Sequence, residues 1–204
     1  MRKWGFVILA SLSLVILTTI SVRADLLQNG GFETMGTQWV NGVTDAPSWS
    51  ITDSSQATGI FNSTYLGLGP HSGNSFLWGG AYNGATANVS QTVTTTAGQF
   101  YNLNFWLANT NGGSAADNNW AVMWDNTTLA SATNAADSKY SDYNFLVSGT
   151  GKDTLTFIFR NEPGAFGLDD VSLKTSSVPI SPSIYLFASG LLSLVFFRRK
   201  SVVC

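Results

Sequence analysis

The sequence predicts an all-β domain, an antiparallel β-sandwich, placed between an N-terminal signal helix and a C-terminal hydrophobic helix. Apolar and polar side chains alternate at every second position in several segments of the middle of the chain, which is the pattern of half-buried strands. Asn, Thr, Ser and Gly are abundant there, whereas Lys and Glu are scarce. This composition favours strands joined by polar loops over helices.

The alternation is clearest in residues 99–107, where one set of side chains is apolar and the other contains Asn and Trp. The apolar set, expected to face the core, is Tyr101, Leu103, Phe105 and Leu107, and the other set is Asn102, Asn104 and Trp106. Further strands are expected at 74–78, 88–96, 120–124, 143–147 and 155–159. Trp120 and Trp124 share a face with Val122, so we interpret both as core residues.

Turn-forming residues separate these segments, so we expect short loops between the strands. They are Asn83-Gly84, Ala97-Gly98, Asn111-Gly112-Gly113, Gly149-Thr150-Gly151 and Glu162-Pro163-Gly164. Many short strands at this spacing are typical of a sandwich.

The alternation changes phase at the adjacent carboxylates Asp169 and Asp170. The apolar positions in 166–168 and those in 171–173 are out of step by one residue. One extra residue in a strand predicts a β-bulge, and bulges often redirect side chains toward a site.

Residues 1–24 have the features of a secretory signal peptide. Arg2 and Lys3 are basic, residues 6–20 are apolar apart from small polar residues, and cleavage is expected after Ala24. An uncleaved anchor is the alternative, which the apolar length needed to span a bilayer disfavours. The sandwich domain is then expected to cover residues 25–175.

The remaining residues, 176–204, form a tail with three parts. A Pro/Ser spacer is followed by an apolar run over 184–197 and by the basic cluster Arg198, Arg199 and Lys200. Measured from residue 180 to residue 197, the apolar stretch is just as long as the shortest helices that span a membrane. Basic residues stay on the cytoplasmic side, so this order places the domain outside the inner membrane.

Val178-Pro179, the 186–192 core and the basic end of the tail resemble the PEP-CTERM sorting signal of Gram-negative bacteria. The resemblance implies an exosortase as processing partner and a transient membrane anchor. It also implies delivery to the cell surface or the extracellular matrix. A permanent one-helix anchor without sorting is the alternative.

The charge of the middle part narrows the class of partner. All 12 acidic residues lie between Asp25 and Asp170, and residues 25–175 hold four basic residues, so the net charge of this part is about −8. Such a surface repels nucleic acid backbones and is compatible with neutral glycans or with divalent cations. The single cysteine, Cys204, lies in the tail, so the domain has no disulfide.

Asn29-Gly30-Gly31-Phe32-Glu33 near the start and the 166–173 segment at the end together resemble the galactose-binding-like jelly roll of carbohydrate-binding modules, the family 4/9 type. The segments 89–93 and 98–107 are also similar to it, so the resemblance covers most of residues 26–174. It implies that the first and last strands lie close together, often beside a structural calcium ion. Many surface proteins with this tail carry such a domain.

The resemblance implies that Glu33, Asp169 and Asp170 hold calcium, with loop carbonyls and Asp53 as further ligands. Ca²⁺ takes six to eight oxygen ligands, several of them carboxylates. In the alternative, these three carboxylates only accept hydrogen bonds from backbone amides at a bulge and a strand end.

Aromatic and amide side chains are the expected contacts for a sugar, since pyranose rings stack on Trp and Tyr while amides bind hydroxyls. Trp106 is the best candidate because its neighbours in the strand occupy the core face. Asn104 lies in the same polar set, and Trp78 and Tyr82 flank the turn at Gly79-Gly80. Any of these tryptophans could instead belong to the core.

The sequence gives only weak indications of a catalytic site. His71, the single histidine, lies in a turn, and there is no Gly-x-Ser-x-Gly motif, so we interpret it as a loop residue. A glycosidase needs two facing carboxylates, and nothing in the sequence pairs Glu33 with Glu162. We therefore expect a non-catalytic exported protein that binds or organises extracellular polysaccharide. A structural matrix protein without a sugar site is the alternative, and a polysaccharide-cleaving enzyme is the third hypothesis.

Overall fold

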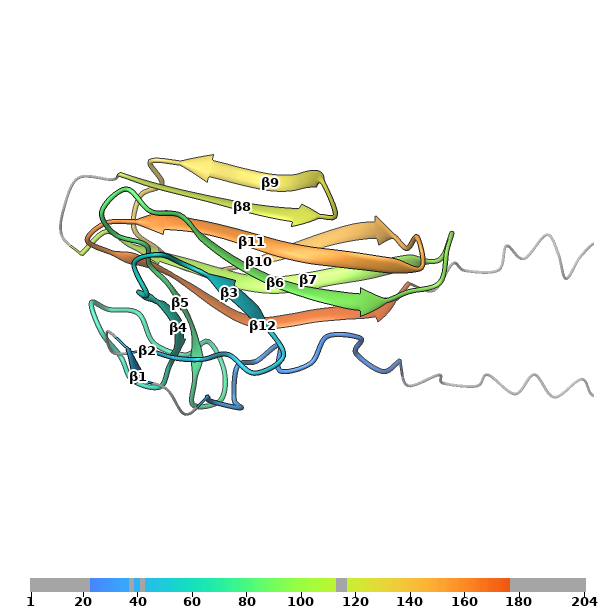
Figure 1. The fold of residues 1–204 in the computed structure, drawn as a ribbon, viewed down its shortest axis with the longest axis horizontal. Coiled ribbons are helices and arrows are strands. Elements are labelled where there is room, and N and C mark those ends of the chain that lie inside the picture. Colours follow the sequence, from blue (N-terminus) through green and yellow to red (C-terminus); the bar gives the residue numbers. More distant parts are fainter. Residues whose placement is uncertain (1–22, 37–38, 41–42, 113–116, 177–204) are drawn as a thin grey trace, which may run out of the picture.

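The computed structural model describes residues 23–36, 39–40, 43–112 and 117–176 (Figure 1). This part is an antiparallel β-sandwich of two sheets, as the sequence predicts. Its residues form no helix, so none of them belongs to a helix that could cross a membrane. The predicted signal helix, the hydrophobic C-terminal helix and the sorting residues Val178, Pro179, Arg198, Arg199 and Lys200 lie outside the described residues.

The two sheets form the two layers of Figure 1. The larger has seven strands in the spatial order β1 (Trp39–Val40), β2 (Val43–Thr44), β4 (Thr58–Phe61), β5 (Phe76–Gly79), β12 (Ala165–Thr175), β7 (Phe100–Thr110) and β10 (Ser138–Ser148). The smaller has five strands in the order β3 (Ser50–Thr52), β6 (Ala87–Thr94), β11 (Lys152–Asn161), β8 (Asn118–Trp124) and β9 (Thr127–Thr133).

The core lies between the sheets and is built from the alternating apolar positions. The buried inner residues of β7 and β11 are Tyr101, Leu103, Phe105, Leu107, Leu155, Phe157 and Phe159, as the alternation predicts. Phe105 meets Phe157 across the sheets, edge to face, with ring centroids 5.0 Å apart. Trp120 and Trp124 in β8 are also buried, which confirms their interpretation as core residues.

The first described residues lie along β12, the last strand, in the larger sheet. The Leu26 amide donates to the Leu173 carbonyl at 2.9 Å, and the Val171 amide donates to the Gly30 carbonyl at 2.9 Å. Gly30 is required for this approach because a Cβ there would lie 1.9 Å from the Val171 oxygen. The two end motifs are thus adjacent, as the resemblance implies.

Both neighbours of β7 carry a β-bulge. In β12, Asp170 and Val171 together oppose one residue of β7, between the pairs Asp169–Trp106 and Ser172–Asn104. This confirms the bulge predicted at the adjacent carboxylates, and Asp170 adopts a positive φ of 50°. The bulge in β10, which the alternation does not predict, lies between the pairs Ser138–Asn109 and Ser141–Leu107.

The outer face of the seven-stranded sheet carries a second, smaller apolar cluster. Its buried members are Leu68, Phe76, Trp78, Ala108 and Ala165. Leu68 comes from the connection between β4 and β5, residues 62–75, which folds over this face. This connection also builds the site described below.

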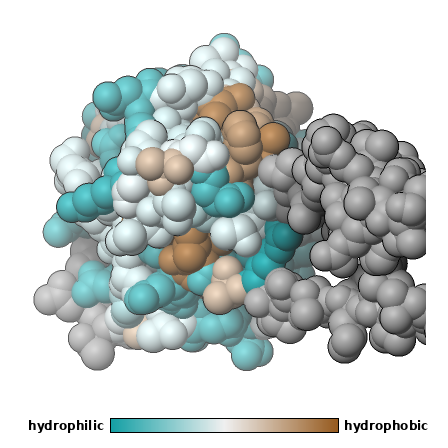
Figure 2. Space-filling model, turned by 90° about the vertical axis from the view of Figure 1, so that its right-hand side faces the viewer, coloured by the Kyte–Doolittle hydropathy of each residue, from teal (hydrophilic) through white to brown (hydrophobic). Residues whose placement is uncertain are grey.

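The opposite end of the sandwich is where residues 23 and 176 leave the domain (Figure 1). The Arg23 guanidinium donates to the Thr175 carbonyl, and the Ser176 amide donates to the Phe100 carbonyl at 2.8 Å. Seen from this end, the surface is mostly hydrophilic or neutral, with separate hydrophobic areas (Figure 2). Phe100 and Leu146 are the large apolar side chains exposed on β7 and β10.

Candidate functional site

Three carboxylates hold the part of the 62–75 connection that follows Pro70. Glu33 Oε1 accepts the backbone amides of Asn74 at 2.9 Å and Ser75 at 3.1 Å. Gly73, between them and Ser72, has a φ of +61°, and a Cβ there would lie 2.1 Å from Glu33 Oε1. Glu33 therefore fixes a turn that only glycine fits without displacement.

Asp169 and Asp170 hold the first half of the same turn. Asp169 is fully buried, and its Oδ2 accepts the amides of His71 at 2.9 Å and Ser72 at 3.2 Å. Asp170 accepts the Ser72 hydroxyl at 2.7 Å and lies 2.6 Å from His71 Nδ1. Burial raises the pKa of Asp169 to about 6, since its amide hydrogen bonds only partly offset the loss of water.

Glu33 and Asp169 bind backbone amides, as in the alternative to calcium, whereas Asp170 contacts the side chains of Ser72 and His71. Ca²⁺ needs six to eight oxygens, and here the oxygens of Glu33, Asp169 and Asp170 already accept loop donors. Among the residues that the structure describes, no three His, Cys, Asp or Glu side chains are grouped so as to hold a metal ion. Calcium binding by Glu33, Asp169 and Asp170 stays a prediction.

Trp106 lies next to this turn and is covered by His71. The two rings are stacked, with centroids 4.0 Å apart and an interplanar angle of 16°. The Tyr140 ring meets His71 edge-on, with centroids 5.2 Å apart. Trp106 faces outward, as the alternation predicts, and His71 occupies the stacking position on its ring.

The other predicted ligand residues lie in two places. Asn104 faces outward beside Trp106 and donates to Asn144 Oδ1 at 2.7 Å and to the carboxylate of Asp142 at 2.5 Å. Trp78 is buried in the outer apolar cluster. Burial raises the pKa of the neighbouring Tyr82 hydroxyl, and its hydrogen bond with Trp78 opposes that effect.

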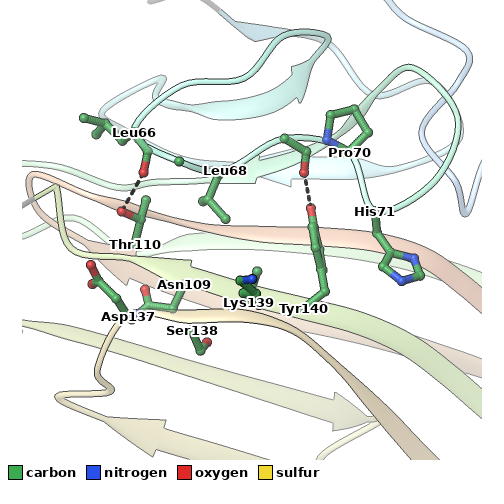
Figure 3. Close-up of a pocket in the computed structure, with 13 residues that line it drawn as sticks. Leu66, Leu68, Pro70, His71, Asn109, Thr110, Asp137, Ser138, Lys139 and Tyr140 are labelled. Atoms are coloured by element: carbon green, nitrogen blue, oxygen red, sulfur yellow. Dashed lines mark hydrogen bonds between the residues drawn. The ribbon is translucent and has the colours of Figure 1, made fainter.

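A pocket of about 600 Å³ lies between the 62–75 connection and the start of β10 (Figure 3). One wall is the stretch from Leu66 to His71, the floor is Ala108 to Thr110 of β7, and the other wall runs from Asp137 to Tyr140. The size lies within the range of about 300–1,000 Å³ that is usual for small-molecule sites. Its lining combines aliphatic side chains with a carboxylate, an ammonium and hydroxyls.

The bulge in β10 shapes this pocket. Lys139 and Tyr140 together oppose Ala108, so two consecutive side chains line the pocket where regular pleating would send one of them to the other face. The Tyr140 hydroxyl donates to the Gly69 carbonyl at 2.9 Å, which ties the two walls together (Figure 3). Burial strongly raises the pKa of this hydroxyl, so it stays protonated as a donor.

Buried asparagines support the floor and the second wall. Asn109 donates to the carbonyls of Ala135 and Ala136, both at 3.0 Å, just before the wall begins. The backbone N–H of Asn111 donates to Asp137 Oδ1 at 2.7 Å and so orients that carboxylate at the pocket. Asn161 donates to Asn109 Oδ1 at 2.7 Å and extends the network into the core.

The sequence does not predict this pocket, because its walls come from 66–71 and 137–140. Neither segment shows clean alternation, and Lys139 and Tyr140 form an unpredicted bulge. The sequence holds one weak indication of the pocket: Asp137-Ser138-Lys139-Tyr140 combines a charge pair with an aromatic residue near a strand end.

The chain matches no protein-family model and no curated protein sequence. Its fold is similar to that of TmCBM61, a carbohydrate-binding module solved with β-1,4-galactotriose (TM-score 0.53, 18% identity, covering 75% of this chain and 99% of the module). It is also similar to the Stig cyclase Fisc from Fischerella sp. TAU (TM-score 0.52, 15% identity, 76% and 98% covered). A third similar structure is the K3 cleaved adhesin domain of Lys-gingipain from Porphyromonas gingivalis (TM-score 0.50, 15% identity, 74% and 98% covered). A sugar-binding module, a cyclase and an adhesin domain thus share this sandwich, so the fold alone does not determine function.

Proposed function

We propose that this protein is an exported surface or matrix protein whose sandwich binds neutral extracellular polysaccharide in the pocket between the 62–75 connection and β10. Export, exosortase processing and surface delivery rest on the two chain ends described in the sequence analysis. The similarity of the fold to a carbohydrate-binding module supports the ligand class.

The observation that carries the proposal is the composition of the pocket. The Asp137 carboxylate accepts hydrogen bonds, the Lys139 ammonium donates them, and Tyr140 with Leu68 supplies apolar surface. Sugars present alternating hydroxyls and C–H faces, which these groups complement. A net charge of about −8 over the domain disfavours polyanionic chains and favours neutral ones.

A binding role without cleavage agrees with the placement of the two glutamates. Glu33 accepts the loop amides of Asn74 and Ser75, and Glu162 Oε2 accepts the Asn83 amide at 2.8 Å. Each therefore holds a turn of the backbone. Glycoside hydrolysis instead requires two carboxyl groups facing across one bond.

The test is a binding screen of the purified protein against neutral and anionic polysaccharides, followed by titration calorimetry. We expect saturable binding to a neutral glycan, weakened about tenfold or more by Asp137→Ala because a hydrogen bond to a charged group contributes about 1.5–3 kcal/mol. Lys139→Ala should also weaken binding, whereas its control Lys152→Ala, which removes an exposed cation of β11 outside the pocket lining, should bind normally. Absence of binding to every glycan would overturn the proposal in favour of a structural matrix role.

A further inference from the structure

Tyr65 is an exposed aromatic residue of the turn that leads into the first wall of the pocket. Tyr65 is 56% exposed, whereas Trp78, on which its ring packs, is 5% exposed. The next residue, Leu66, lines the pocket. A flat aromatic ring is therefore presented to solvent one residue before the lining of the pocket begins.

The backbone around Tyr65 is held rigidly. Tyr65 and Leu68 exchange two backbone hydrogen bonds, of 2.8 and 2.9 Å, across a two-residue turn. Thr110 in the pocket floor donates its hydroxyl to the Leu66 carbonyl at 3.0 Å (Figure 3). The Tyr65 ring packs on Trp78, with centroids 5.8 Å apart and planes at 46°. The Tyr65 side chain therefore loses its conformational entropy on folding, and ligand binding does not have to order it again.

The turn also holds a strained residue. Its central residues have positive φ, Leu66 at 50° and Gly67 at 82°. Glycine accepts this conformation, but for a leucine it is unfavourable. Leu66 is 40% exposed, so core packing does not account for it. Strained backbone of this kind is concentrated at binding sites.

We propose that Tyr65 is a stacking platform for a second sugar unit, next to the one held in the pocket. This inference rests on the proposed function and specifies its ligand as an oligosaccharide of at least two linked neutral pyranoses. One unit hydrogen-bonds with Asp137 and Lys139, and the neighbouring unit lays its C–H face on the Tyr65 ring, along the apolar edge formed by Leu66.

Other aromatic residues of the domain are less suited to this role. The ring of Trp106 is stacked on His71, and Trp78 is buried. Phe100 is 43% exposed but begins β7, whereas the pocket floor lies at the other end of that strand. Phe100 is therefore a matched control, an exposed aromatic residue away from the pocket.

The test uses the purified protein and the tetrasaccharides of β-1,4-glucan, β-1,3-glucan and β-1,4-galactan, with their monosaccharides, in titration calorimetry. We expect Tyr65→Ala to weaken tetrasaccharide binding about tenfold, the effect of roughly 1.4 kcal/mol of lost aromatic contact. Monosaccharide binding should change less than about twofold, since one unit fills the pocket alone. Tyr65→Phe and Phe100→Ala should both bind like the unchanged protein.

Tyr65→Leu keeps an apolar contact with Trp78 while removing the flat ring, so it separates stacking from folding. It should lose as much tetrasaccharide affinity as Tyr65→Ala at an unchanged melting temperature. Full tetrasaccharide affinity in both variants, with loss in Asp137→Ala, would overturn the platform and leave the proposed function standing. Failure of the unchanged protein to bind any probe, or any glycan of the wider screen, would overturn both.

Discussion

His71 lies stacked on Trp106, with ring centroids 4.0 Å apart, while its Nδ1 lies 2.6 Å from Asp170. This histidine, which the sequence predicts to be a loop residue, therefore covers the tryptophan expected to be the best sugar contact. One side chain joins the bulge of β12 to the outward face of β7.

The first prediction concerns this contact. We expect His71→Ala to lower the free energy of unfolding by about 1–2 kcal/mol, because it removes an aromatic stack and a hydrogen bond to a carboxylate. His71→Phe keeps the stack and should lose about half as much. Urea unfolding measures both, and a red shift of tryptophan fluorescence should report the uncovering of Trp106. Equal stability of all three proteins would show that the contact does not hold the turn.

The second prediction concerns pH and Asp169. Burial raises its pKa to about 6, above the ordinary value near 4, so the folded state binds a proton more tightly than the unfolded state. The contribution of this group to stability is therefore full below pH 4 and is lost as pH rises from 4 through 6.

Urea unfolding of the protein and of Asp169→Asn, compared between pH 4 and 7, isolates this group because the other carboxylates cancel in the difference. The stability of the unchanged protein should fall relative to the variant by on the order of 2 kcal/mol over this range. A difference that does not change with pH would contradict a raised pKa.

The third prediction concerns Gly73. Gly73→Ala combines a positive φ with a Cβ only 2.1 Å from Glu33 Oε1, so the turn must shift. Gly84→Ala is the matched control, since Gly84 has a φ of +73° but no atom within 4 Å of the added Cβ. Both should lower the melting temperature, and Gly73→Ala should lower it by several degrees more. Equal losses would mean that Glu33 does not confine the turn.

The fourth prediction is calcium binding by Glu33, Asp169 and Asp170. If the cation binds as the resemblance implies, calcium added to EDTA-treated protein raises the melting temperature by several degrees, because it binds only the folded state. Glu33→Gln should abolish the rise, while Asp142→Asn, a carboxylate on the outward face of β10, should keep it. An unchanged melting temperature would leave the loop amides as the partners of these carboxylates.

The sequence predicted the fold where burial has a simple period. In β7 and β11, every second residue meets the core, so alternation identified both the strands and their inner faces. The bulge at Asp169–Asp170 was predictable for the same reason, because one extra residue reverses the faces of a regular pattern.

The strands that the sequence does not predict are those that form because they pair with other segments of the fold. Strands β1 to β4 have two to four residues each, too few for a period to show. Strand β9 is mostly exposed, and its residues form a strand because β8 pairs with it. Contacts of the 62–75 connection, such as Tyr140 with Gly69, join residues 71 positions apart, and no local pattern encodes them.

The placement of the pocket along β7 has a consequence for how the protein reaches a ligand. The strand begins at Phe100, where Ser176 pairs and the chain leaves the domain, and it ends at Thr110 in the pocket floor. Ten residue steps of extended chain separate these points by roughly 30 Å. A domain tethered through the chain that follows Ser176 would therefore carry its pocket on the distal tip, facing away from the point of attachment and open to long polymers.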